Sequence, residues 1–186
     1  MTQKLSMDEL GRVSPDKFKE LEKFPLVIVL DNIRSMMNVG SVFRTADAFR
    51  IEKIVLCGIT ACPPNKEIHK TALGATESVS WQYFEDTVEV VKALRNDNCL
   101  VYALEQTTNS KSLKDFQPQK NQKYALVFGN EVKGVQDSVL QHCHGSIEIP
   151  QFGTKHSFNI SVTAGITLWD FFSKMEHFDA LNQSRK

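Results

Sequence analysis

The sequence predicts a single α/β domain, with a mostly parallel sheet and helices on both of its faces. Its short apolar runs are continuous rather than alternating, which is typical of strands buried on both sides. These runs cover residues 26–30, 53–57, 99–104, 124–128 and 146–149. Helical patterns alternate with the runs, and such alternation builds a sheet covered on two faces. These patterns cover residues 39–49, 87–94, 135–141 and 157–175.

The composition is that of one folded domain with an extension. The chain has 186 residues, of which 41% are hydrophobic and 24% charged. No apolar run approaches the length of a bilayer span and the N-terminus does not resemble a signal peptide, so we expect a cytoplasmic protein. The four cysteines form no C-x-x-C pair, and we expect them to be reduced and mostly buried.

Neither a metal site nor a broad basic surface is indicated. His142, Cys143 and His144 come nearest to a ligand cluster, but adjacent residues point in different directions and no second ligand pair follows. The formal net charge is zero, which argues against extensive phosphate binding. Basic residues do gather within residues 12–23 and 111–123, but from charge alone we expect each group to form a solvated face.

We expect an N-terminal arm over residues 1–24, a main domain over residues 25–176 and a tail over residues 177–186. In the arm, Ser14 and Pro15 are typical of a helix start, as the capping residue and the first helical residue. Phe18 and Leu21 follow, three positions apart, and give this helix a narrow apolar edge that could dock on the domain.

One long stretch of the main domain, residues 107–123, is polar and irregular. A segment of this length without its own secondary structure is either a lid or a surface loop. The other irregular segments follow strands, and in open α/β sheets ligands bind beyond the carboxyl ends of the strands. Three of those segments carry unusual residues.

The first segment, residues 31–46, follows the first strand. Asn38 is predicted to cap the next helix, and Gly40 would permit a close backbone approach. Arg44 lies six positions after Asn38, so both could face one cavity, where a guanidinium would suit a phosphate or a developing oxyanion. The alternative is structural: Asn38 only caps, and Arg44 pairs with Asp47 on the surface.

The second segment, Gly129 to Gly134, is framed by glycines but has neither a phosphate-loop ending nor dinucleotide-fold spacing. We therefore expect no polyphosphate there. Glu131 could hold a polar group or orient an arginine, and a simple turn would use the same glycines.

The third segment, residues 147–162, joins a strand to the last helix. Ser157 and Asn159 are predicted to begin that helix and to offer free backbone N–H groups and side-chain polar atoms. The helix is then apolar on nearly every side, so it must be covered all round. The expected cover is a second subunit, and the alternative is the N-terminal arm.

Together the three segments resemble the motifs of the SpoU (TrmH) group in the SPOUT superfamily of RNA methyltransferases. Residues 38–46 resemble that group's N-x-G-x-x-x-R-T-A, residues 129–134 its G-x-E-x-x-G, and residues 149–162 its I-P-x-x-G-x-x-x-S-x-N-x-S-V. The motifs occur in family order, and the resemblance covers residues 26–172.

The resemblance implies a C-terminal deep trefoil knot, which topology rules alone would not predict. It implies S-adenosyl-L-methionine as the cofactor, no metal, and an RNA site shared by the two subunits of a homodimer. The catalytic residues it implies are Asn38, Arg44, Glu131, Ser157 and Asn159. The cofactor-binding residues it implies are Leu104, Gly129, Ile149 and Phe158, with phenylalanine where relatives usually carry leucine. The match at residues 105–107 is loose, so the resemblance leaves the cofactor contacts of these residues open.

The implied reaction is methylation of a ribose 2′-hydroxyl in structured RNA, achieved mainly by positioning the reactants. Because guanidinium stays protonated in proteins, Arg44 is expected to stabilise the developing alkoxide, with a role as general base as the alternative. The short arm before a compact core favours tRNA over large-subunit rRNA. Two further alternatives are a non-catalytic module that binds RNA and cofactor, and an unrelated α/β protein.

Overall fold

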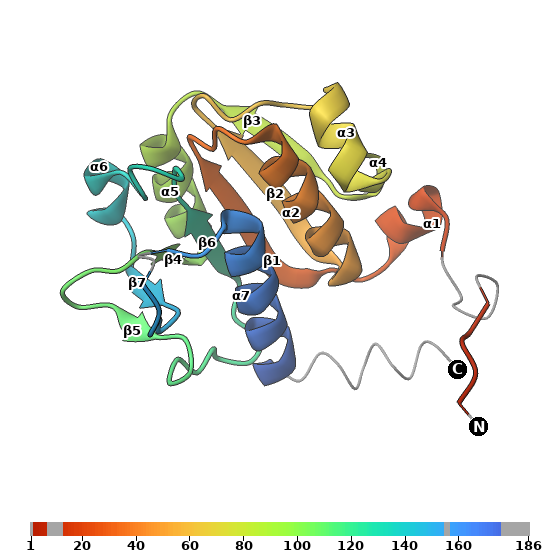
Figure 1. Cartoon of the computed structure of the whole chain (residues 1–186). Coiled ribbons are helices and arrows are strands. Elements are labelled where there is room, and N and C mark those ends of the chain that lie inside the picture. Colours follow the sequence, from red (N-terminus) through yellow and green to blue (C-terminus); the bar gives the residue numbers. More distant parts are fainter. Residues whose placement is uncertain (1, 7–12, 155–156, 176–186) are drawn as a thin grey trace.

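The structure is a computed structural model that describes residues 2–6, 13–154 and 157–175. Its centre is a seven-stranded sheet in the order β3-β2-β1-β6-β4-β7-β5 (Figure 1), and every strand pair is parallel. The strands are β1 (Phe24–Asp31), β2 (Ile51–Cys57), β3 (Trp81–Phe84), β4 (Leu100–Leu104), β5 (Lys111–Ser112), β6 (Tyr124–Phe128) and β7 (Gly145–Glu148). The predicted parallel α/β sheet is therefore confirmed.

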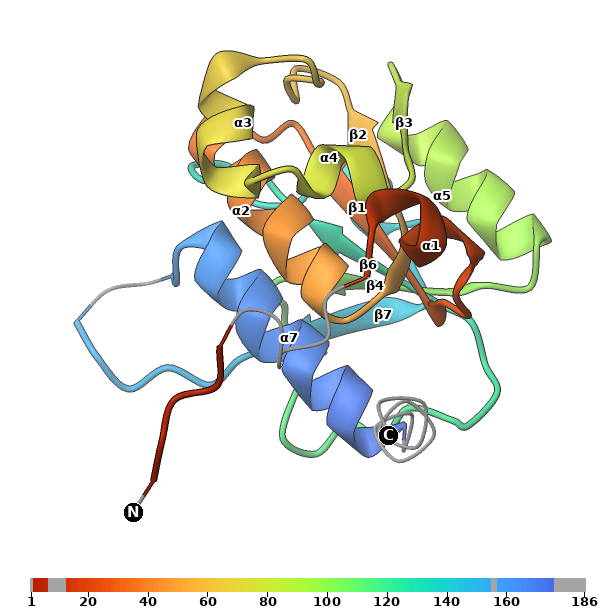
Figure 2. The same ribbon diagram turned by 90° about the vertical axis from the view of Figure 1, so that its right-hand side faces the viewer.

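Helices cover both faces of this sheet, as predicted. On one face α2 and α7 lie side by side, and α5 lies on the other (Figures 1 and 2). The helices are α1 (Pro15–Glu20), α2 (Met36–Ala48), α3 (Lys66–Ala72), α4 (Ala75–Ser78), α5 (Thr87–Asn96), α6 (Asp137–Leu140) and α7 (Ile160–Lys174).

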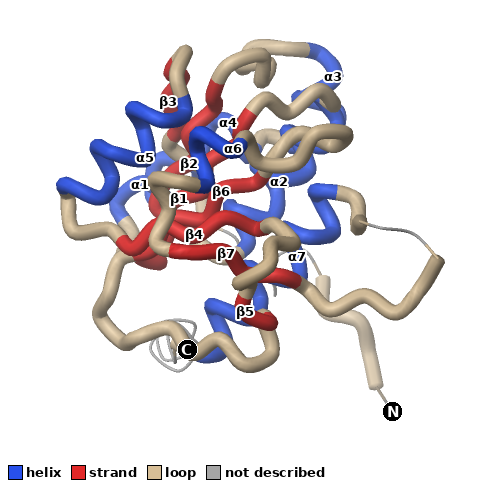
Figure 3. The backbone as a smooth tube through the Cα atoms, turned by 90° about the vertical axis from the view of Figure 1, so that its left-hand side faces the viewer, coloured by secondary structure: helices blue, strands red, loops and turns tan. Residues whose placement is uncertain are grey.

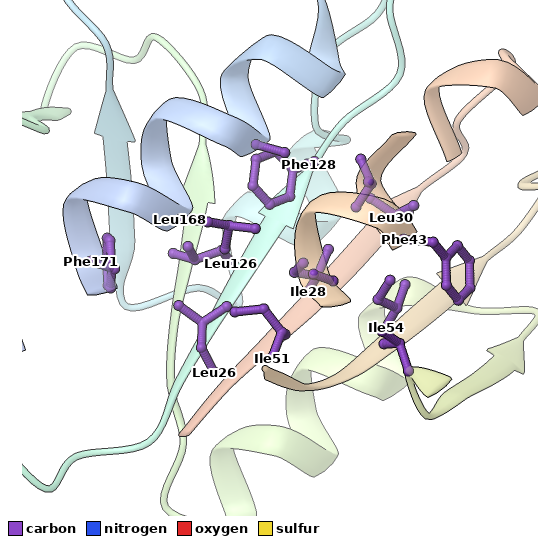
Figure 4. Packing of buried hydrophobic residues seen from close by; sticks show 14 of the residues in the cluster. Leu26, Ile28, Leu30, Phe43, Ile51, Ile54, Leu126, Phe128, Leu168 and Phe171 are labelled. Atoms are coloured by element: carbon purple, nitrogen blue, oxygen red, sulfur yellow. The ribbon is translucent and has the colours of Figure 1, made fainter. Parts of the chain in front are cut away.

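The core forms because the strands bury both of their faces. Side chains of β1, β2 and β6 that point toward α2 and α7 make one large cluster, which includes Ile28, Leu126 and Leu168 (Figure 4). The alternate residues of the same strands, such as Val27 and Val127, pack with α5 and α6 on the opposite face. The continuous apolar runs of the sequence thus correspond to strands covered on both sides.

All five predicted strands exist, with ends shifted by one or two residues. The two strands that the prediction missed lie at the edges of the sheet. Strand β3 carries mostly exposed side chains and β5 has two residues, so neither gives a continuous apolar run. Helices α3 and α4 were also missed, because each is too short to show helical periodicity.

The arm helix is confirmed as α1. Ser14 is its N-cap, with an Oγ that accepts a hydrogen bond from the Lys17 backbone, and Pro15 begins the helix. Phe18 is buried in the core cluster, so this part of the arm docks on the domain as expected. The three-part division of the chain stays a prediction, because residues 1, 7–12 and 176–186 lie outside the described residues.

The stretch 107–123 is a packed surface loop rather than a lid. It contains β5, which extends the sheet beside β7 (Figure 3), and it buries Leu113 and Phe116 in the core. The Lys174 ammonium of α7 donates to the carbonyl oxygens of Leu113 (2.7 Å) and Phe116 (2.9 Å). These contacts tie the loop to the last helix.

The described residues contain neither a membrane-spanning helix nor a cluster of metal ligands. None of the described helices has the length and apolar character needed to cross a membrane. No group of three or more His, Cys, Asp or Glu side chains in this part of the chain could hold a metal ion. The imidazole of His144 instead accepts a hydrogen bond from the Val101 backbone at Nδ1, over 3.0 Å.

Candidate active site

The three segments meet at one edge of the sheet because parallel strands end together. Leu30 of β1 lies in register with Phe128 of β6, and Phe128 with Leu104 of β4. Leu104 in turn lies beside Ile147 of β7. The turns that follow these strands therefore project from a common carboxyl edge, where α/β proteins bind their ligands.

Glu131 joins the second segment to the first. Its Oε2 accepts a hydrogen bond from the Arg34 backbone (3.0 Å), and its Oε1 accepts from the Ser35 backbone (3.0 Å) and from Nδ2 of Asn38 (3.1 Å). Asn130 adds a bond from its Nδ2 to the carbonyl oxygen of Asn32, at 2.7 Å. The Glu131 carboxylate thus fixes the turn that begins α2, and these bonds do not involve an arginine side chain.

These bonds change the acidity of Glu131. Partial burial alone would raise its pKa, since burial disfavours the charged form. The hydrogen bonds from Arg34, Ser35 and Asn38 stabilise the carboxylate and outweigh burial, so the pKa lies below its ordinary value. Glu131 is therefore a fixed negative charge at neutral pH.

Asn38 is not the helix cap that the sequence predicted. Ser35 caps α2, and its Oγ accepts a hydrogen bond from the Asn38 backbone at 3.2 Å. Asn38 lies one turn inside the helix, where its side chain is free of capping. Its Nδ2 donates to Glu131 and its Oδ1 accepts from Nδ2 of Asn159, at 3.2 Å. Asn38 thus stands between the second and third segments.

Asn159 begins the last helix, as expected. It is the N-cap of α7, and its Oδ1 accepts from the Ser161 backbone at 2.8 Å. The same side chain uses its Nδ2 for Asn38, so one residue both starts the helix and joins it to the first segment. Ser157 precedes the helix and is exposed.

The glycines of the first two segments serve close packing. A Cβ on Gly40 would lie 2.1 Å from Oγ1 of Thr71, so the close approach predicted there is made by α3. A Cβ on Gly129 would lie 2.2 Å from the backbone of Gly134, and Gly134 itself has a φ of +69°. The second turn is too tight for side chains at these two positions.

A cavity of about 520 Å³ opens beside this junction. All four predicted cofactor residues line it: Leu104, Gly129, Ile149 and Phe158. Glu131, Ser157 and Asn159 line it as well, so seven of the nine predicted site residues surround one space. Ligand pockets commonly measure about 300–1,000 Å³. The cavity is large enough for a nucleoside with an amino-acid tail.

Arg44 does not take part in this arrangement. It is exposed on α2 and does not line the cavity. The expected pairing with Asp47 is also absent from the hydrogen bonds and ion pairs of the described residues, since Asp47 accepts from the Ser78 hydroxyl instead. The single chain therefore brings Asn38, Glu131 and Asn159 together and leaves Arg44 outside.

Asp31 is a buried residue that supports the turns of the site and that sequence reasoning missed. It is fully buried at the end of β1. Its Oδ1 accepts hydrogen bonds from Oγ1 of Thr87 (2.6 Å) and from Nε2 of Gln136 (3.0 Å), and its neighbour Asn32 donates to the same atom. Asp31 thus ties together β1, the start of α5 and the chain just after the second segment. A carboxylate at the end of an apolar strand is the signal that could have revealed it.

Comparisons with known proteins identify the family and the fold of the chain. A sequence profile described as the SpoU rRNA Methylase family matches residues 25–169. Over 153 residues the chain is 29% identical to the 23S rRNA (guanosine-2′-O-)-methyltransferase RlmB of Neisseria meningitidis serogroup B. The aligned region covers 82% of this chain and 60% of that protein. The chain thus spans about three fifths of the length of the curated relatives it matches.

Solved structures of related proteins have the same fold. An AdoMet-bound rRNA methyltransferase from Sinorhizobium meliloti superposes with a TM-score of 0.74 at 25% identity, over 86% of this chain and 60% of that one. A TrmH/SpoU tRNA modifying enzyme from A. aeolicus gives a TM-score of 0.76 at 21% identity, over 89% and 82% of the two chains.

Proposed function

Because the chain belongs to the SpoU rRNA methylase family, we propose that it transfers a methyl group from S-adenosylmethionine to a ribose 2′-hydroxyl of structured RNA. One observation carries the proposal. Asn38, Glu131 and Asn159, one from each of the three motifs, form a continuous hydrogen-bonded chain at the cavity. These three side chains come from segments far apart in the sequence and meet beside a space that can hold a ligand.

The cavity suits this cofactor. Its volume of about 520 Å³ accommodates an adenosine and a methionine moiety. Leu104, Ile149 and Phe158 offer apolar surface for a purine ring, and the backbone of Gly129 lines the same space. When bound, the cofactor supplies a methyl group on a positively charged sulfur, which needs no metal for its transfer.

The residues of the chain would then position the reactants. Glu131 holds the turn before α2, and this in turn fixes the Asn38 amide at the start of the helix. Asn159 and Ser157 present polar atoms to the same space, where they can orient a ribose. Holding nucleophile and methyl carbon in line accounts for most of the acceleration in such a displacement.

Arg44 supplies charge stabilisation in this proposal. A guanidinium stays protonated in proteins, so its role is to stabilise the developing alkoxide and a neighbouring phosphate. Since Arg44 does not line the cavity of its own chain, we propose that it serves the cavity of a second copy. Catalysis would then require a homodimer.

The outer face of α7 supports such a dimer. Val162, Ile166 and Trp169 follow one another at helical spacing and are exposed to 47%, 38% and 52%. A large apolar stripe on a surface helix is typical of an interface. The C-terminal trefoil knot belongs to the same proposal, because family members tie this part of the chain into one.

The RNA substrate has two candidates. The sequence predicts tRNA, and that preference stays a prediction. The second candidate is large-subunit rRNA, which is favoured by the 29% identity to a 23S rRNA methyltransferase. Both place the enzyme in the cytoplasm, and both use the same chemistry.

The test is a transfer assay with the full chain and tritiated S-adenosylmethionine on bulk tRNA and on 23S rRNA. We expect label that survives alkaline digestion as a dinucleotide, because a methylated 2′-oxygen cannot attack the neighbouring phosphate. Mapping of ribose methylation in strains with and without the gene then identifies the nucleotide. Label that disappears into mononucleotides, or no label with either RNA, would contradict the proposal.

A further inference from the structure

Glu105 lies outside the three family motifs. It directly follows β4 and lines the cavity. Its Oε2 accepts a hydrogen bond from the Val135 backbone at 2.9 Å, and its Oε1 accepts from the Gln106 backbone at 3.0 Å. A Cβ on Gly134 would lie 2.2 Å from Oε2, so the second turn packs directly against this carboxylate. Glu105 is therefore held rigidly by the tight turn that contains Glu131.

The charges around the cavity are unbalanced. Among the described residues that line it, the ionisable side chains are Glu105, Glu131, Glu148 and Lys133. Three carboxylates against one ammonium leave a surplus of two negative charges. The carboxylate oxygens of Glu131 accept three hydrogen bonds from the first segment. Glu148 also faces a second, open hollow of about 370 Å³ beside the cavity.

We propose that Glu105 is a specificity-determining residue, which makes the cavity prefer the positively charged methyl donor to the demethylated product. The inference rests on the proposed function, because it takes the donor to be S-adenosylmethionine. That donor has a sulfonium and carries one more positive charge than S-adenosylhomocysteine, whose sulfur is neutral. Apart from this methyl group and the charge on sulfur, the two ligands are identical.

The physical reason is that a fixed charge in a partly enclosed space acts over a lower effective dielectric constant than in water. A carboxylate on the wall therefore stabilises a bound cation more than its neutral counterpart. After transfer this attraction is lost, which favours release of the product and binding of a new donor. Lys133 lines the same cavity, and its positive charge opposes the effect.

The test compares the affinities of purified full-length variants for S-adenosylmethionine and S-adenosylhomocysteine by isothermal titration calorimetry. In Glu105→Gln the side chain keeps its size but loses its charge and one of its two acceptor atoms. Loss of one hydrogen bond with the turn should lower the affinity for both ligands by the same factor. Loss of the charge should lower only the affinity for S-adenosylmethionine. We therefore expect that affinity to fall about three- to tenfold further than the affinity for S-adenosylhomocysteine.

Two more variants complete the design. Glu105→Asp keeps the charge and shortens the side chain, so it should lower both affinities while it retains the wild-type ratio between them. Glu89→Gln removes an exposed carboxylate on α5 that pairs with Lys92, and it should leave both affinities unchanged. Raising the salt concentration should reduce the effect of Glu105→Gln, because salt screens charges.

The outcomes separate this inference from the proposed function. If the wild type binds both ligands and Glu105→Gln weakens them equally, Glu105 only shapes the turn and the inference is wrong. If Glu105→Asp shifts the ratio as much as Glu105→Gln, charge is not the cause and the inference is again wrong. If the folded wild type binds neither ligand, the proposed function and the inference fall together.

Discussion

Nδ2 of Asn159 lies 3.2 Å from Oδ1 of Asn38, although the two residues are 121 positions apart in the sequence. The contact joins the first turns of α2 and α7, which run side by side over the same face of the sheet (Figure 2). At the far end of the pair, the rings of Phe49 and Trp169 are 6.2 Å apart. The two helices therefore run in the same direction, with their polar ends at the cavity.

Asn38→Asp should disrupt this junction more than Asn38→Ala does. The aspartate would place a second carboxylate beside Oε1 of Glu131, where the wild type has a donor. We expect Asn38→Asp to lower the free energy of unfolding by about 1–3 kcal/mol, and Asn38→Ala by about 0.5–1.5 kcal/mol. Urea denaturation of both variants measures the difference. Equal losses would mean that the two carboxylates do not repel each other measurably at this position.

Arg44→Ala should abolish methyl transfer and leave the cofactor site intact. Arg44 is exposed and does not line the cavity, so cofactor affinity should stay within about twofold of the wild type. Loss of a group that stabilises a developing oxyanion costs about 10²–10³ in rate. Lys92→Ala, on α5, is the control for the loss of a surface cation. Near-normal turnover in Arg44→Ala would show that Arg44 is misassigned.

The contribution of Glu131 to stability should depend on pH in a defined direction. Its pKa in the folded chain lies below the ordinary value of 4.5, so its bonds stabilise the fold above that pH. This contribution is lost as the pH falls through the lowered pKa, where the carboxylate becomes protonated. The stability difference between wild type and Glu131→Gln should therefore be largest at neutral pH and shrink below about pH 4.5. Denaturant unfolding at several pH values measures it, and a constant difference would contradict the assignment.

Asp31→Ala should destabilise the whole domain. The substitution leaves the buried Thr87 hydroxyl and the Gln136 side chain without their acceptor. The Thr87 hydroxyl is buried, and a buried polar group without a partner costs about 1–3 kcal/mol, so we expect a loss of roughly 1–3 kcal/mol in the free energy of unfolding. Asp137→Ala, at an exposed position in the first turn of α6, is the matched control. A loss below about 1 kcal/mol for Asp31→Ala would contradict this account of the network.

Ile166→Glu should separate the proposed dimer into monomers. Residue 166 lies in the exposed apolar stripe of α7, between Val162 and Trp169. A carboxylate there would be buried without a partner in an interface, which is strongly unfavourable. Sedimentation velocity should show a monomer, and circular dichroism should show an unchanged fold. A wild-type chain that sediments as a monomer at micromolar concentration would refute the dimer.

Several features could be read from the sequence because they are local. The runs at 26–30 and 124–128 are short, uniformly apolar and rich in branched residues, which is typical of a strand covered on both faces. Ser14 and Pro15 predicted the start of α1, since capping involves neighbouring residues only. The prediction that Asn38 caps α2 was wrong because Ser35, three residues earlier, supplies an equally suitable side chain.

The sequence by itself determined the α/β class, the order of the three motifs and their placement after buried strands, because period and residue type are properties of short segments. The tertiary structure decided that Asn38 bonds Glu131 and Asn159, that Asp31 is buried among distant partners, and that Gly40 is needed by α3. These contacts depend on the strand order, which sets which turns become neighbours at the carboxyl edge. Strand order arises from packing across the whole domain, so no local pattern contains it.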